Sequence, residues 1–178
     1  YGLSQARDAV RRSGRVIVVE GYLDVIALAQ AGIAETVAPL GTALTVDQLR
    51  VLRRLSDGII ACFDGDPAGR RAAARSFPLF LEAGLWGRGA FLPAGEDPDS
   101  FVRAQGRDAM EACLAAAAPL VEAFLDDVGG PDREAVGRRA EAAREVARIL
   151  KRVSNPYEYD VLARLAAERL GVREEVLR

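Results

Sequence analysis

The sequence has no histidine, only two cysteines and no long apolar run. Without histidine, catalytic triads that use an imidazole and zinc sites with histidine ligands are excluded, so carboxylates carry the available acid–base and metal chemistry. Cys62 and Cys113 lie far apart in apolar or alanine-rich stretches, which is typical of small core residues. No run approaches the roughly 20 apolar residues that a membrane-spanning helix needs. We therefore expect no membrane partner.

Half of the 178 residues are hydrophobic and 28% are charged, as in an ordinary globular domain. The net charge is −2, so the sequence lacks the overall basic character that favours binding to nucleic-acid phosphates. The first residue is Tyr1, the only methionine is Met110, and no secretory leader is visible. We expect the chain to be a segment of a longer protein.

Short apolar runs alternate with helical patterns in the first hundred residues. The runs predict strands over 16–19, 36–40, 59–63 and 90–92, and the stretches between them predict helices over 22–31, after Thr45, and from Pro67 to about 82. Such alternation requires crossover connections between strands. We therefore expect an α/β fold with a mostly parallel sheet flanked by helices.

The composition changes after about residue 105. Residues 106–178 are rich in Ala, Arg and Glu at helical spacing, with breaks at Gly129-Gly130-Pro131, at Asn155-Pro156 and at Gly171. This pattern predicts a small bundle of three or four helices. The expected domains are therefore 1–105 and 106–178.

Carboxylates follow three of the predicted strands. Glu20 ends the first, Asp64 and Asp66 follow the third, and Asp97 and Asp99 follow the fourth. Because ligands bind at the carboxyl ends of parallel strands, we expect these side chains to face one edge of the sheet. Like charges about 4 Å apart repel by roughly 4 kcal/mol at an effective dielectric near 20, so such a cluster needs protons, arginines or divalent cations. Oxygen-only ligands favour Mg²⁺ or Mn²⁺, and paired ions of this kind serve phosphoryl transfer.

The aspartates also have a purely structural interpretation. Asp-Gly is a turn signal, and Asp66-Pro67 and Asp97-Pro98 are typical helix starts in which the aspartate caps the helix. Three functional alternatives also stay open: a Mg²⁺-dependent nuclease, another phosphotransferase, and a non-catalytic module whose acidic edge binds a basic partner. A phosphatase built around Asp64 would need a supporting lysine, and the only lysine is Lys151, in the helical region.

Four motifs, in order, resemble the TOPRIM core of bacterial DNA primases. They are EGYLDVIALAQAGI at 20–33, LGTALT at 40–45, CFDGDPAGRRAA at 62–73 and FLPAGEDPDSFV at 91–102. The opening YGLSQA and the later NPYEYDVLARLAAERLGV are similar to the same family, so the resemblance covers nearly the whole chain. It implies a TOPRIM (Rossmann-like) fold and a DNA-templated RNA polymerase that makes short primers for replication.

The resemblance also implies roles for individual residues. The catalytic residues would be Glu20, Asp64 and Asp66, and the metal-binding set would be Glu20, Asp64, Asp66, Asp97 and Asp99, holding two or more Mg²⁺ or Mn²⁺ ions. Glu20 would be either a ligand or the group that deprotonates the primer 3′-hydroxyl.

Further residues would surround this set. Gly21, Gly41 and Gly65 would let the backbone approach phosphates closely. Arg70 would contact phosphate or remain solvated at the surface. Asp24 would either support the metal ligands or act as a first-turn helix charge.

The implied partners are a single-stranded DNA template, NTPs and the replicative helicase, the last through a domain beyond Arg178. The family's zinc ribbon and basic subdomain would precede this segment, so zinc is expected only there. We expect a monomeric fragment of cytoplasmic location, at the nucleoid and its replication forks. Alone, it should bind Mg²⁺ or Mn²⁺ weakly and polymerise poorly or not at all.

Overall fold

The structure, a computed structural model, describes residues 1–39, 41–130 and 136–178. Leu40, at the end of the second predicted strand, and Pro131, in a predicted helix break, lie outside the described residues. The chain divides into two units, Tyr1–Leu120 and Val121–Arg178.

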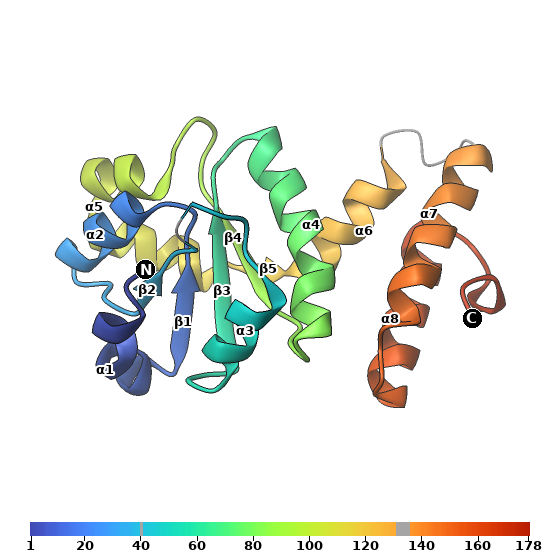
Figure 1. Cartoon of the computed structure of the whole chain (residues 1–178). Coiled ribbons are helices and arrows are strands. Elements are labelled where there is room, and N and C mark those ends of the chain that lie inside the picture. Colours follow the sequence, from blue (N-terminus) through green and yellow to red (C-terminus); the bar gives the residue numbers. More distant parts are fainter. Residues whose placement is uncertain (40, 131–135) are drawn as a thin grey trace. The chain divides into compact units, whose positions relative to one another are not determined.

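The strands of the first unit form one sheet with the order β2-β1-β3-β4-β5 (Figure 1). The strands are β1 Arg15–Val18, β2 Thr36–Val37, β3 Gly58–Phe63, β4 Arg88–Phe91 and β5 Ala118–Pro119. The first four pair in parallel, and β5 runs antiparallel to β4. The expected mostly parallel sheet is confirmed, with a fifth strand that the sequence pattern did not predict.

Helices cover both faces of the sheet (Figure 1). Helices α2 Tyr22–Gln30 and α5 Pro98–Ala115 pack against each other over one face. Helices α3 Val46–Arg53 and α4 Pro67–Glu82 contact each other on the opposite face, and α1 Leu3–Ser13 lies beside β1 and β2.

The core explains why the strands are apolar along their whole length. Ile17 and Ile60 face the same buried cluster as Leu28 of α2 and Met110 of α5. Their neighbours on the opposite face, such as Ile59, are also buried. A strand covered on both faces has no solvent side on which polar residues would alternate.

The predicted domain boundary at 105/106 falls inside α5. Gly106 interrupts this helix with φ 82° and ψ 177°, a conformation that glycine adopts without a Cβ clash. Beyond the kink, Met110 and Leu114 are buried in the core of the first unit, and β5 then pairs with β4. The first unit therefore extends to Leu120, because the residues after Gly106 still build its core.

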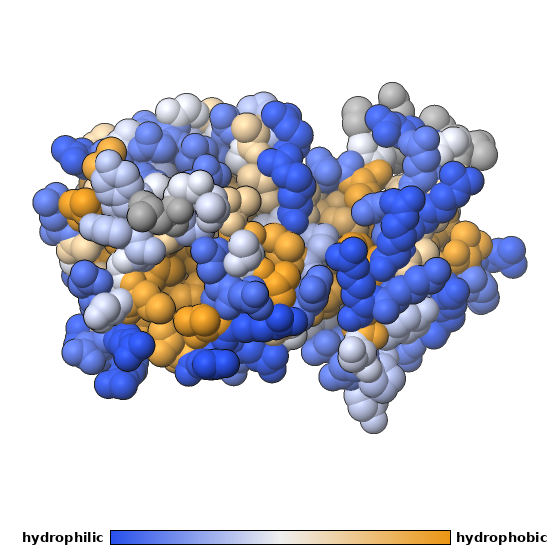
Figure 2. Space-filling model, in the orientation of Figure 1, coloured by the Kyte–Doolittle hydropathy of each residue, from blue (hydrophilic) through white to orange (hydrophobic). Residues whose placement is uncertain are grey.

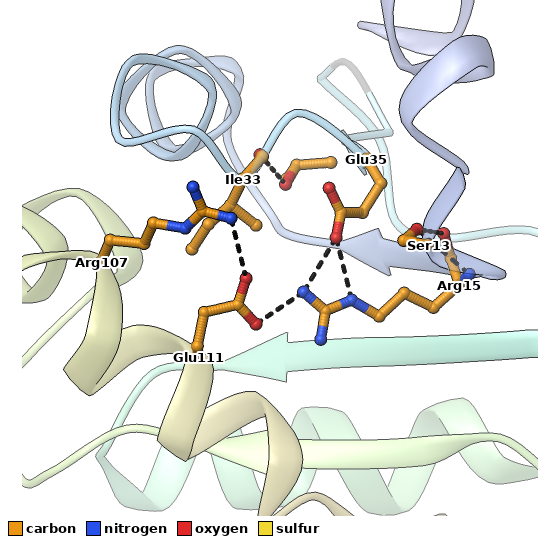
Figure 3. Close-up of polar contacts among 7 residues, drawn as sticks. Ser13, Arg15, Ile33, Glu35, Arg107 and Glu111 are labelled. Carbon is orange, nitrogen blue, oxygen red and sulfur yellow. Dashed lines mark hydrogen bonds and ion pairs between the residues drawn. The ribbon is translucent and has the colours of Figure 1, made fainter. Parts of the chain in front are cut away.

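A charged cluster joins the start of β1 to α5 (Figure 3). Arg15 Nε donates to Glu35 Oε1 at 2.9 Å, and Arg15 Nη2 donates to Glu111 Oε2 at 2.7 Å. Glu35 is only 7% exposed, and Arg107 adds an ion pair of 3.8 Å to Glu111. This cluster lies at the amino ends of the strands, at the opposite edge of the sheet from the predicted carboxylates.

The second unit is helical. It begins at Val121, within α6 Leu120–Gly129, and continues with α7 Val136–Leu150, α8 Pro156–Leu170 and the 3-10 helix η1 Glu174–Val176. Asn155 caps α8 by accepting the Tyr157 N–H at 3.0 Å, and Gly171 ends the helix at φ 63°. The helical bundle expected after the sheet is confirmed for the described residues.

One apolar hollow opens on the surface of the first unit. The space-filling view shows hydrophobic side chains gathered between α1 and α3 (Figure 2). They surround a cavity of about 290 Å³ whose lining includes Tyr1, Leu44 and Val51.

Within the described ranges, no helix combines the length and the apolar character that crossing a bilayer requires.

Candidate active site

The sheet reverses its order between β1 and β3. The chain leaves β1 for β2 on one side and then crosses to β3 on the other side, and ligands of such sheets bind in the crevice at this reversal. Val18 is paired with Ala61. Glu20, two residues after Val18, and Asp64, three residues after Ala61, therefore leave adjacent strands at the crevice.

Burial and neighbouring carboxylates raise the pKa of Asp64 to about 6. Burial contributes most, followed by the charges of Glu20, Asp24, Asp97 and Asp66. Because such interactions weaken with distance, each of these carboxylates lies near enough to disfavour the ionised form of Asp64. Folding thus brings acidic groups from three loops to this edge of the sheet.

Asp66 and Asp97 are helix caps as well as members of this acidic group. The Asp66 carboxylate accepts the Gly69 N–H at 2.7 Å at the start of α4. The Asp97 carboxylate accepts the Ser100 N–H at 2.7 Å at the start of α5. The structural interpretation of both aspartates is therefore confirmed. It leaves room for a second role, because one carboxylate offers about four acceptor positions.

Asp99 differs from the other predicted ligands because its carboxylate pairs with Arg103, one turn further along α5. In the part of the chain that the structure describes, no arginine or lysine forms an ion pair with Glu20, Asp64 or Asp66. The crevice itself is therefore not neutralised by these cations.

Asp24 bridges two of the three loops. Its Oδ2 accepts the Gly21 N–H at 3.0 Å, and its Oδ1 accepts the Asp99 N–H at 3.3 Å. Burial raises the pKa of Asp24, the two backbone hydrogen bonds lower it, and the charges of Asp97 and Asp99 raise it further. The sequence pattern left open whether Asp24 serves the site, and it contained no signal for a bond to a residue 75 positions away.

Gly65 lies in a tight backbone contact between the β3–α4 and β4–α5 loops. A Cβ atom at this position would lie 1.8 Å from the Pro93 carbonyl oxygen. The Gly65 N–H donates to the Glu96 carbonyl at 3.2 Å. Only glycine fits here, and packing within the chain already requires it. Glu96 was not singled out from the sequence, because any residue offers a backbone carbonyl.

The remaining two glycines differ in their surroundings. A Cβ at Gly21 would lie 3.0 Å from Asp24 Oδ2, so a side chain there would press on that carboxylate. Gly41 has φ +67°, and apart from its two chain neighbours no described residue has an atom within 4 Å of a Cβ position there. A ligand could therefore approach the Gly41 backbone, whereas the Gly21 N–H already donates a hydrogen bond to Asp24.

A cavity of about 540 Å³ lies beside Glu20, between the ends of β1 and β3 and helix α4. Its lining is mainly apolar, with polar side chains from Glu20, Thr42, Arg75 and Ser76. The Arg70 guanidinium lies 5.9 Å from the centre of the Phe91 ring, at the end of β4. Arg75 was not predicted, since nothing in the arginine-rich sequence distinguishes it before the bounds of α4 are known.

The donor set suits a hard divalent cation, although the side chains do not form a finished cage. All five predicted ligands are carboxylates, the oxygen donors that Mg²⁺ and Mn²⁺ prefer. Among the described residues, no three His, Cys, Asp or Glu side chains are grouped closely enough to hold a metal ion. Mutual repulsion is a sufficient physical reason for carboxylates to stay apart when no cation lies between them.

Comparisons with known proteins agree with this arrangement. The family model described as Toprim-like matches residues 17–102, and the one described as the DnaB-helicase binding domain of primase matches residues 131–175. A DNA primase of Neisseria meningitidis serogroup A is 38% identical over 177 residues, which cover 97% of this chain and 30% of the relative.

Solved structures show the same relation. A crystal structure of a DNA primase domain from Pseudomonas aeruginosa has a TM-score of 0.87 and 40% identity, covering 99% of this chain and 57% of that one. The DnaG primase catalytic domain bound to ssDNA has a TM-score of 0.82 and 37% identity, covering 98% of this chain and 57% of that one. The chain belongs to the bacterial DNA primase family. The primase resemblance and the TOPRIM fold are thereby confirmed, and this primase segment spans about 30% of the length of the Neisseria relative.

Proposed function

We propose that this primase segment provides the catalytic edge at which ribonucleoside triphosphates are joined into RNA primers on a single-stranded DNA template. The observation that carries the proposal is the gathering of acidic groups around Asp64 at the switch point of the sheet. Membership of the primase family supplies the reaction class. Such an activity would place the protein at replication forks.

The proposed cofactor is Mg²⁺ or Mn²⁺, held by Glu20, Asp64 and Asp66 with Asp97 and Asp99 completing the set. When bound, such ions neutralise phosphate charge and favour ionisation of an attacking hydroxyl. Glu20, which is exposed and lines the cavity beside β1, would bind metal or accept the proton of the primer 3′-hydroxyl. Asp99 would have to exchange its Arg103 partner for the cation.

Phosphate groups of the incoming NTP are proposed to lie against open backbone and basic side chains at the same edge. Gly41 offers unobstructed backbone, and Arg70 is an exposed guanidinium beside Phe91. Gly21 and Gly65 are less suited than Gly41, because both already make contacts within the chain.

The decisive experiment tests this segment within a complete primase domain. A chimera would carry residues 1–178 in place of the matching part of the Pseudomonas aeruginosa primase domain, which is 40% identical. With Mn²⁺, NTPs and labelled single-stranded DNA, we expect NTPs to be joined and the DNA to stay intact. Asp64→Asn with Asp66→Asn should abolish the product. Cleavage of the DNA would instead indicate the nuclease alternative.

A second proposal concerns the replicative helicase. From the sequence, helicase contact was expected only through a domain beyond Arg178, whereas the helicase-binding family model matches residues inside the chain, 131–175. We propose that this region contributes to helicase binding. The test is a titration of the fluorescently labelled chain with a DnaB-type helicase, in which unchanged anisotropy at saturating helicase would contradict the proposal.

A further inference from the structure

The loops that carry the acidic groups are tied to one another by one backbone–backbone hydrogen bond and by the side chain of Asp24. The Gly65 N–H binds the Glu96 carbonyl and joins the β3–α4 loop to the β4–α5 loop. The Asp24 carboxylate joins the β1–α2 turn, through Gly21, to the start of α5, through Asp99. The β4–α5 loop is therefore linked to both of the others.

We propose that Asp24 is a positioning residue that holds Glu20 in place relative to Asp97 and Asp99, and that it does not itself bind the metal. The inference rests on the proposed function, because it assigns Asp24 a role toward the same cation site. Each Asp24 carboxylate oxygen accepts a backbone N–H at or next to a proposed ligand. Gly21 directly follows Glu20, and Asp99 is itself a proposed ligand, two positions after Asp97.

Helix capping alone does not account for this arrangement. A carboxylate at the third position of a helix that bonds back to the cap residue is one half of an ordinary capping box, and the 3.0 Å bond to Gly21 meets that description. The bond to Asp99 reaches a different helix start and contributes nothing to capping α2. It also requires a second acceptor oxygen, so an amide at this position would lose one of the two links.

The test uses the complete chain and its Asp24→Asn variant. Mn²⁺ affinity is measured from the EPR signal of free Mn²⁺, and the number of water molecules on the bound ion from proton relaxation. Loss of an outer support to metal ligands typically weakens metal binding by about 10–100-fold, and we expect a loss in this range with an unchanged water count. The melting temperature in EDTA should stay close to that of the original chain.

Two results would overturn the proposal. Unchanged Mn²⁺ affinity would reduce Asp24 to a helix cap, and one additional water per bound ion would make it a direct ligand. Asp108→Asn is the matched control, since it removes one exposed carboxylate of α5 beyond the Gly106 kink. If the original chain did not bind Mn²⁺ at all, the proposed function would fail, independently of the role of Asp24.

Gly21→Ala provides a second test that leaves Asp24 in place. The Gly21 backbone, at φ −107° and ψ 153°, suits alanine, but the methyl group would lie 3.0 Å from Asp24 Oδ2. We expect a several-fold loss of Mn²⁺ affinity and no further loss when Gly21→Ala is added to Asp24→Asn, because both changes act on one link. Unchanged affinity in Gly21→Ala, or fully additive losses, would contradict the inference.

Discussion

At the scale of single residues, the main property of Asp64 is that ionising its carboxyl group costs free energy in the folded chain. It is half-buried and lies among other carboxylates, so its ionised form is disfavoured, and a cation that offsets their charge favours it. Binding of a divalent cation and folding should therefore be thermodynamically linked through this residue.

Replacing Asp64 by asparagine should uncouple folding from the cation. At a metal concentration of about 100 times the dissociation constant, we expect Mn²⁺ to stabilise the original chain by about 2.7 kcal/mol. Asp64→Asn should lose most of this gain while its metal-free melting temperature stays equal or rises, because repulsion is relieved. Thermal denaturation with Mn²⁺ or EDTA measures both effects, with Asp108→Asn as the control. A variant that kept the full Mn²⁺ effect would contradict the metal site.

The same carboxyl group should make metal-free stability fall as pH rises from about 4 to about 6. Unfolded Asp64 ionises near its ordinary pKa of 3.8, whereas the pKa in the folded chain is about 6. Between these values the folded state holds a proton that the unfolded state has released. The free energy of unfolding therefore decreases with rising pH and levels off above about 6.

Urea denaturation in EDTA across this range, compared with Asp64→Asn, isolates the contribution of Asp64 from those of other carboxyl groups. Parallel curves for the two proteins would show that the pKa of Asp64 is not raised.

At the scale of elements, the close approach of two loops at Gly65 should make that position intolerant of any side chain. Gly65→Ala places a methyl group 1.8 Å from the Pro93 oxygen, and we expect a loss of roughly 3 kcal/mol or more. Gly14→Ala is the control, because its Cβ would meet nothing within 4 Å and only the positive φ of +71° is strained, at a cost of about 1–2 kcal/mol. Chemical denaturation should rank Gly65→Ala as the less stable variant.

The charged cluster at the other edge of the sheet joins β1 and α5 to the loop before β2. Arg15→Met would leave Glu35 buried without its cation, and we expect a loss of roughly 2–4 kcal/mol. Arg11→Met removes only an exposed pair with Asp8 and should cost about 0–0.5 kcal/mol. If Arg15→Met and Arg11→Met lowered the unfolding free energy equally, the buried ion pairs of Arg15 would contribute no more to stability than an exposed pair.

The strands and the acidic edge can be predicted from local patterns, whereas the links between loops cannot. The apolar runs before Glu20 and Asp64 indicate buried strands, and buried parallel strands bring the residues at their carboxyl ends to one edge of the sheet. Strand β5 was missed because alanine favours helix, and its two residues form a strand only by pairing with β4. The bond from Asp24 to Asp99 spans 75 positions and depends on tertiary packing alone.

At the scale of the whole molecule, α8 exposes two large hydrophobic side chains that could contact a partner protein. Tyr157 is 82% exposed and Val161, one turn later, is 59% exposed; both lie within the helicase-binding match. If this region binds helicase, Val161→Asp should weaken binding by about tenfold or more. Val51→Asp, on α3 of the other unit and 42% exposed, is the control. Fluorescence anisotropy titrations would show the difference, and equal affinities would remove α8 from the interface.

Gly65 also bears on how primase sequences should be aligned. Since the middle position of Asp64-Gly65-Asp66 faces the main chain after β4, a homologue with a larger residue there must route that loop differently. Across the family, the identity of this middle residue should therefore covary with insertions or deletions between the fourth strand and the helix after it.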